Sequence, residues 1–290
     1  MSAADLAFTP AREQAAMVRR GDVTPSELVE SYLARIERID PTLDAYLTVA
    51  ADAAGDAARA AEDRLAAGDD APFLGVPISV KDLVDTAGIR TTHGTAAWHD
   101  RVPEHDAEVV RRLRAAGFVV LGKTNTPQLG CRATTESPKF PTCRNPWDTT
   151  RHAGGSSGGA ASALAAGLCP ISLGSDGGGS IRIPAGWCGV FGIKPSRGRV
   201  SSAPRPTPWA SVIGPIARTV DDAAALLDVI AGYVTGDPWW APPPARPFVD
   251  EVGADHGRLR VAVTTAHPNP GDEVHPAWRD ATHATAPARR

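Results

Sequence analysis

GGSSGGAASALAAGLCPISLGSDGGGSIRIPA, residues 154–185, is the stretch that decides how this chain folds. It holds two glycine clusters, each with serine, and between them an alanine-rich segment with the composition of a helix. Glycine loses the most conformational freedom on folding, so an ordered protein keeps it where backbone must approach a ligand or adopt dihedrals that other residues avoid. The hydroxyls of Ser156, Ser157 and Ser180 stand within that backbone. We therefore expect an active site with a serine nucleophile beside main-chain N–H groups.

The composition is that of an ordinary globular protein, with 42% hydrophobic and 22% charged residues in a chain of 290. A net charge of -3 gives no electrostatic reason to expect nucleic acid or an anionic membrane as partner. The first residues lack the continuous apolar region of a secretory signal, and no run approaches the roughly 18 apolar residues of a spanning helix. These features predict a cytoplasmic protein.

The cysteines do not have the spacing of a metal site. Cys131, Cys143, Cys169 and Cys188 form no CxxC pair, and no nearby histidine pair completes a zinc pattern. We expect four small buried side chains with reduced thiols, and neither a metal nor a cofactor.

Upstream of the glycine clusters, the pattern alternates between helices and strands. Residues 24–27 form a helix start, because Thr24 can cap it and Glu27 can close a capping box. Periodic apolar residues continue this helix to Pro41, and a second helix is expected from about residue 45 to 67. A buried strand over 73–80 ends at Lys81, a helix over 106–116 follows, and the next strand covers 118–121. The order strand, helix, strand indicates an α/β fold with a mixed, largely parallel sheet flanked by helices.

Downstream, residues 122–148 are expected to form an irregular loop that lines the site. A helix over 158–166, a strand over 170–173, a helix from Thr219 to Ala231 and a last strand over 259–263 follow. Nothing periodic remains after Val263. We therefore expect one domain over 1–265, which either ends on an edge strand or lacks the C-terminal part of the fold, and an irregular tail over 266–290.

Three readings of the glycine clusters compete. A phosphate-binding loop would need GxxxxGK[ST] or GxGxxG, and neither is present. A nucleophile elbow at Ser156 matches GxSxG, but it requires a strand directly before it, and we expect no strand over 145–152. It also requires a histidine, and those after the cluster all lie in the last part of the chain.

The third reading pairs a serine with a lysine base. Ser180 follows Gly177, Gly178 and Gly179, whose N–H groups could converge as an oxyanion hole. Lys81 could activate the serine if burial lowers its pKa, since desolvation disfavours the ammonium form. Ser156 could then relay the proton between Lys81 and Ser180.

The motifs that carry this reading resemble the signature of the amidase signature family of serine hydrolases. The central block continues as LGSDGGGSIRIPAGWCGVFGIKPSRGRVS over 173–201, and supporting blocks are GVPISVKD (75–82), GKTNTPQLG (122–130) and NPWD (145–148). The resemblance covers about residues 10–265. It implies Ser180 as acyl nucleophile, Ser156 as bridging serine after a cis Gly155–Ser156 peptide and Lys81 as base, with the oxyanion hole at Gly177, Gly178, Gly179 and Ser180.

The function implied is hydrolysis of a linear or cyclic carboxylic amide through an acyl-enzyme, with ammonia or an amine released. The stretches 131–148 and 236–248 look most like general amidases and 6-aminohexanoate cyclic dimer hydrolases. The glutaminase subunit of the tRNA-dependent amidotransferase is a weaker alternative, and a truncated, non-catalytic or partner-binding fragment is another. The expected partner is a small amide, with a homodimer left open as the assembly.

Overall fold

The computed structural model describes residues 3–204 and 210–286, which separate into two compact units, Met1–Val252 and Gly253–Arg290. The predicted domain boundary after residue 265 stays a prediction. Within the described residues, no helix is both long and apolar enough to cross a membrane.

The first unit is built on a six-stranded sheet with the order β1-β3-β2-β6-β8-β7. The strands are β1 (Tyr46–Val49), β2 (Pro77–Lys81), β3 (Val119–Thr124), β6 (Ile171–Asp176), β7 (Phe191–Gly192) and β8 (Val212–Ala217). Pairs β2/β3 and β2/β6 are parallel, and pairs β1/β3, β6/β8 and β7/β8 are antiparallel. Strands β2, β3, β6 and β7 therefore point one way, as expected for a mixed, largely parallel sheet. A separate hairpin joins β4 (Arg144–Asn145) and β5 (Asp148–His152).

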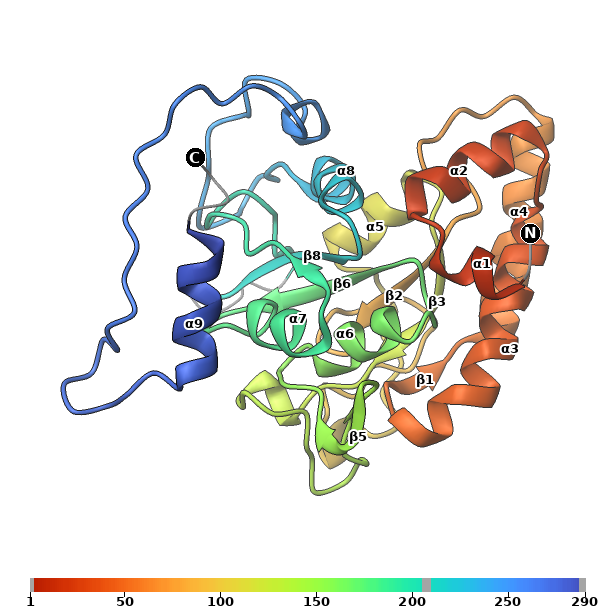
Figure 1. Cartoon of the computed structure of the whole chain (residues 1–290). Coiled ribbons are helices and arrows are strands. Elements are labelled where there is room, and N and C mark those ends of the chain that lie inside the picture. Colours follow the sequence, from red (N-terminus) through yellow and green to blue (C-terminus); the bar gives the residue numbers. More distant parts are fainter. Residues whose placement is uncertain (1–2, 205–209, 287–290) are drawn as a thin grey trace. The chain divides into compact units, whose positions relative to one another are not determined.

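The helices of this unit cover both faces of the sheet (Figure 1). They are α1 (Ala3–Phe8), α2 (Ala11–Arg20), α3 (Pro25–Leu43), α4 (Ala51–Ala66), α5 (Glu108–Ala115), α6 (Gly158–Ala165), α7 (Arg182–Cys188) and α8 (Val220–Ile230). Short 3₁₀ turns are η1 (Ala96–Trp98), η2 (Gln128–Gly130) and η3 (Phe248–Glu251). The expected caps are present: Thr24 with Glu27 forms a capping box on α3, and Thr219 caps α8.

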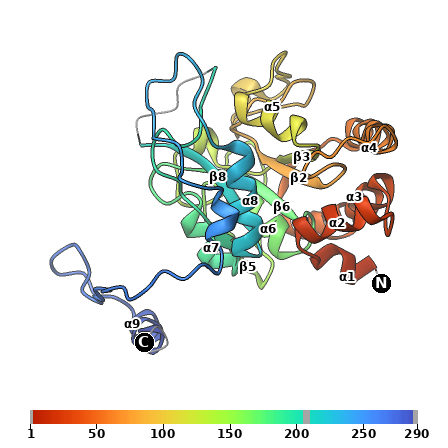
Figure 2. The same ribbon diagram turned by 90° about the horizontal axis from the view of Figure 1, so that it is seen from above.

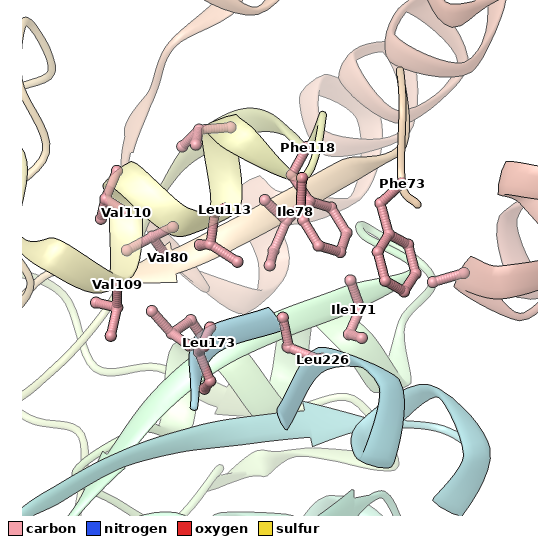
Figure 3. Packing of buried hydrophobic residues seen from close by; sticks show 14 of the residues in the cluster. Phe73, Ile78, Val80, Val109, Val110, Leu113, Phe118, Ile171, Leu173 and Leu226 are labelled. Carbon is pink, nitrogen blue, oxygen red and sulfur yellow. The ribbon is translucent and has the colours of Figure 1, made fainter. Parts of the chain in front are cut away.

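One face of the sheet packs against α5 and α8. Ile78 and Val80 of β2 contact the apolar side of α5, including Leu113, and Leu173 of β6 lies in the same buried cluster as Leu226 of α8 (Figure 3). Successive side chains of a strand point to opposite faces, so Ser79 and Lys81 point to the other face. That face is covered by α3 and α6, and α3 packs along α4 (Figure 2). Lys81 thus faces the helix that follows the first glycine cluster.

Several expected elements differ from the structure. The predicted helix over 45–67 begins with strand β1, and Pro41 lies inside α3 rather than ending it. We expected no strand over 145–152, but β5 lies there, so that expectation was wrong. Strand β8 was missed because Gly214 and Pro215 interrupt its apolar pattern, although every residue of the strand is buried.

The second unit, from Gly253 onward, contains one helix in its described part, α9 (Pro276–Thr285). The strand predicted over 259–263 was wrong, because these residues form no ladder and Leu259, Val261 and Val263 are exposed. A strand needs a neighbour's backbone to satisfy its N–H and C=O groups. Helix α9 was missed, although Pro276 at its first position is a typical helix-start signal. Its N-cap is His275, whose ring accepts from the Ala277 N–H.

Candidate active site

Lys81 lies at the carboxyl end of β2, in the middle of the sheet, with its side chain fully buried. Its Nζ is 2.7 Å from Ser156 Oγ and 3.0 Å from Ser175 Oγ, and it donates a longer bond of 3.4 Å to the Ser175 carbonyl. The neighbouring parallel strand β6 ends at Asp176, one residue beyond Ser175. Because parallel strands bring their carboxyl ends to one edge, Lys81 meets the loop that carries the second glycine cluster.

Burial lowers the pKa of Lys81 to about 7, and the charge of Asp176 only partly opposes that shift. Near neutral pH a substantial fraction of Lys81 is therefore the free amine, which has a lone pair for a proton. A lysine in this state can act as a general base, whereas an exposed lysine cannot at the same pH.

Ser156 stands at the N-terminal end of α6, and its hydroxyl is almost completely buried against Lys81. The Gly155–Ser156 peptide is cis, as the family resemblance implied. A Cβ on Gly155 would lie 2.6 Å from the Thr134 carbonyl carbon, so only glycine fits before this serine. The next residue is tied to the second cluster, because the Ser157 N–H donates to the Ser180 carbonyl at 3.0 Å.

Ser180 lies between β6 and α7, is partly exposed, and lines a cavity of about 410 Å³ with Ser156. Among the described residues its hydroxyl makes no hydrogen bond, so the link from Ser156 to Ser180 is not formed in this structure. Catalytic hydrogen bonds are often long without substrate and shorten when it binds. Gly177 and Gly178 line the same cavity as Ser180.

Asp176, which we did not single out in the sequence, organises the glycine loop. Its carboxylate accepts from the N–H groups of Gly179 at 2.7 Å and Ile181 at 3.2 Å, and from both ends of the Arg182 guanidinium. Burial raises the pKa of Asp176, but the hydrogen bonds from Arg182 and the backbone outweigh it and lower the pKa. The Gly179 N–H is therefore engaged with Asp176. Within the described residues the N–H groups of Gly177, Gly178 and Ser180 have no partner.

Ser175 was also missed, although it stands directly before Asp176 in the GSDGGGS motif. It contacts Lys81 through its hydroxyl and its carbonyl, and the same carbonyl accepts from Ser157 Oγ at 3.1 Å. The sequence signal was a small polar residue at the end of a buried strand, which is common in many folds.

The nucleophile-elbow reading is weakened by the contacts of Ser156 rather than by the local fold. Strand β5, a turn and α6 do provide the strand-turn-helix context. The partner of Ser156 Oγ is Lys81, however, and the nearby His152 ring accepts from the Gly154 N–H instead.

The cysteines and other possible metal ligands form no site in the described part of the chain. No group of three or more histidine, cysteine, aspartate or glutamate side chains could hold a metal there. All four cysteines are free thiols, and Cys143, Cys169 and Cys188 are buried as expected. The expectation was wrong for Cys131, which is exposed and lines the 410 Å³ cavity.

The chain combines a mixed α/β sheet with a buried lysine and two serines in glycine-rich loops. The family model described as Amidase matches residues 27–287, and the chain belongs to that family. A putative amidase of Mycobacterium tuberculosis is 52% identical over 272 residues, which cover 93% of this chain and 57% of that protein. The 6-aminohexanoate-cyclic-dimer hydrolase of Paenarthrobacter ureafaciens is 41% identical over 280 residues, 92% of this chain and 54% of the relative.

Solved structures that resemble this chain are also amide hydrolases. A 6-aminohexanoate cyclic dimer hydrolase complexed with substrate superposes with a TM-score of 0.92 and 38% identity, covering 97% of this chain and 58% of that one. The native peptide amidase from Stenotrophomonas maltophilia reaches 0.78 with 35% identity, covering 84% and 52%. The chain thus spans between half and three fifths of the length of these relatives.

Proposed function

We propose that this chain hydrolyses a carboxylic amide through an acyl-enzyme on Ser180. The observation that carries the proposal is the hydrogen bond between buried Lys81 and Ser156 beside the cavity that Ser180 lines. Membership in the amidase family supports amide hydrolysis as the reaction class.

In the proposed first step, Lys81 as free amine takes the proton of Ser156 Oγ, and Ser156 takes the proton of Ser180. Ser180 Oγ then bonds to the amide carbon, and the carbonyl oxygen becomes an oxyanion. The N–H groups of Gly177, Gly178 and Ser180 stabilise that charge, and Gly179 holds the loop through Asp176. Losing one such donor typically costs about 10²–10³ in rate.

The tetrahedral intermediate collapses as the proton returns through Ser156 to the amide nitrogen, which leaves as ammonia or an amine. Water then attacks the acyl carbon of the Ser180 ester, and its proton passes through Ser156 to Lys81. The bond from the acyl carbon to Ser180 Oγ breaks, the proton returns through Ser156 to Ser180 Oγ, and the product leaves as a carboxylic acid that ionises in water. No step needs a metal or a cofactor. The substrate is a small linear or cyclic amide, consistent with a cavity at the lower end of the ligand-pocket range.

A non-catalytic or partner-binding role is the second candidate, because the hydroxyls of Ser156 and Ser180 are not hydrogen-bonded to each other. Labelling with a fluorophosphonate probe and ammonia release from simple amides distinguish the two. We expect the wild type to be labelled and to release ammonia, Ser180→Ala to do neither, and Ser26→Ala, a serine at the start of α3, to match the wild type. Full turnover in Ser180→Ala would overturn the mechanism, and an unlabelled, inactive wild type would favour the second role. Self-association stays a prediction that sedimentation would decide.

A further inference from the structure

The cavity beside Ser180 has a second polar wall that the proposed mechanism does not use. It is formed by Asp85 and His93, both of which line the cavity. His93 Nε2 is 3.0 Å from Asp85 Oδ1, and the Arg101 guanidinium donates to both oxygens of Asp85 at 2.7 Å. Apart from these two, the described lining is apolar, or consists of glycine, serine and cysteine.

The hydrogen-bonding state of His93 follows from its partner. Burial raises the pKa of Asp85, but the hydrogen bonds from His93 and Arg101 outweigh it and hold the pKa well below its usual value. Two groups contact Nε2 of His93: the Asp85 carboxylate at 3.0 Å and, at a longer 3.4 Å, the Arg101 guanidinium. An ionised carboxylate can only accept, so the shorter contact assigns the hydrogen to Nε2. In the neutral ring Nδ1 is then an acceptor, and it has no hydrogen-bond partner among the described residues.

The ring is also held in place by its surroundings. Trp98 packs against it edge-on, with ring centroids 4.9 Å apart. The backbone of His93 has a φ of 54°, in the left-handed region that residues other than glycine rarely adopt. Its carbonyl accepts from Leu129, which precedes Gly130, and a Cβ on Gly130 would lie 3.4 Å from Ser156 Oγ. A strained backbone fixed from several sides is typical of a functional position.

We propose that His93 is a specificity-determining residue that favours amides carrying a hydrogen-bond donor, a hydroxyl or an amine, on the part of the substrate that reaches the Asp85–His93 wall. The inference rests on the proposed amidase function and names the substrate class of the same site. Asp85 and Arg101 act through His93, because they fix which ring nitrogen is the acceptor. A substrate with a methyl group at this position leaves Nδ1 buried without a partner, which penalises its binding.

The test compares a homologous series of straight-chain alkanamides with their terminal hydroxy and amino counterparts. For each member two quantities are measured: kcat/KM from ammonia release, and the concentration that protects Ser180 from a fluorophosphonate probe. We expect one chain length at which the donor-bearing amide is preferred by about tenfold or more, the range of a single hydrogen bond to a buried group. The preference should fall to near unity in His93→Gly, which removes the ring without backbone strain at this φ.

Two variants complete the design. His93→Asn keeps an acceptor and tolerates the left-handed backbone, so it should retain part of the preference. His99→Asn is the matched control, because His99 pairs with Asp100 outside the cavity and should leave the preference unchanged. Thermal unfolding of each variant separates a lost preference from a lost fold.

The outcomes separate this inference from the proposed function. Hydrolysis without any preference for donors in the wild type, or an unchanged preference in His93→Gly, would overturn the role of His93 and leave the amidase function standing. If no amide is hydrolysed, the proposed function fails, and calorimetric binding of the same amides to wild type and His93→Gly decides whether His93 selects the ligands of the cavity.

Discussion

Lys81 Nζ and Ser156 Oγ lie 2.7 Å apart, although 75 residues separate them in the chain. The contact joins the end of a central strand to the start of the helix that covers it. Burial at this position lowers the pKa of Lys81 from 10.5, the value of an exposed lysine, to about 7.

The pH dependence of catalysis should report the pKa of Lys81. In the proposed mechanism the free amine of Lys81 is the reactive form, and its pKa is about 7, so kcat/KM should rise with pH through about 7 and level off above it. Lys81→Met should abolish turnover at every pH, while Lys139→Met, at an exposed position, should reproduce the wild-type profile. A profile that is flat across this range would contradict the role of Lys81 as base.

The same buried lysine should make stability depend on pH. In the unfolded chain the pKa of Lys81 is about 10.5, whereas in the folded protein it is about 7. Between these values the unfolded state binds more protons, so the contribution of Lys81 to stability increases as pH rises. Below about 7 the full cost of burying the ammonium remains. Denaturant unfolding should show a smaller increase with pH across this window in Lys81→Met than in wild type, and an equal increase would argue against a buried, shifted lysine.

Asp176 should act by positioning the glycine loop. Asp176→Asn turns one acceptor oxygen into an N–H₂ group, which would face N–H donors of Gly179, Ile181 or Arg182. We expect kcat to fall by about 10², comparable to the loss of an oxyanion donor, with KM changing less. Asp148→Asn is the control, because that exposed carboxylate accepts from Thr150 in the β4–β5 hairpin. Equal effects of the two substitutions on kcat would refute the positioning role.

Gly159 should tolerate no side chain. A Cβ there would lie 2.3 Å from the Asn125 nitrogen and 2.4 Å from the Ala45 oxygen, both of which are backbone atoms. Gly159→Ala should destabilise the protein by at least about 1–3 kcal/mol, because helix α6 would have to move away from the sheet. Gly186→Ala, in α7 with nothing within 4 Å of its Cβ, should be neutral or stabilising in thermal unfolding. Matching melting temperatures for the two variants would contradict this close packing.

Much of the fold could be predicted from local sequence, and the reasons for the failures are physical. The capping box at Thr24 and the cap at Thr219 are hydrogen bonds between residues close in sequence, so the residue types alone predict them. Strands β1 and β8 depend on neighbours far along the chain, and their own residues carry a weak pattern. The segment over 259–263 has the alternation of a strand but finds no ladder partner in the structure. The alternation of apolar and polar residues shows which face a strand would bury. Whether the strand forms depends on a neighbouring strand that pairs with its backbone.

By itself, the sequence determined that two glycine-rich clusters with serine and a lysine after a buried strand belong to one site of an α/β protein. Only the tertiary structure decided that the Lys81 side chain is fully buried, that Ser175 and Asp176 contact the residues of the site, and that His93 lines the same cavity as Ser180. The physical reason is that residue type and spacing fix what a side chain can do chemically. Its desolvation, its partners and its pKa come from atoms that other segments bring to it.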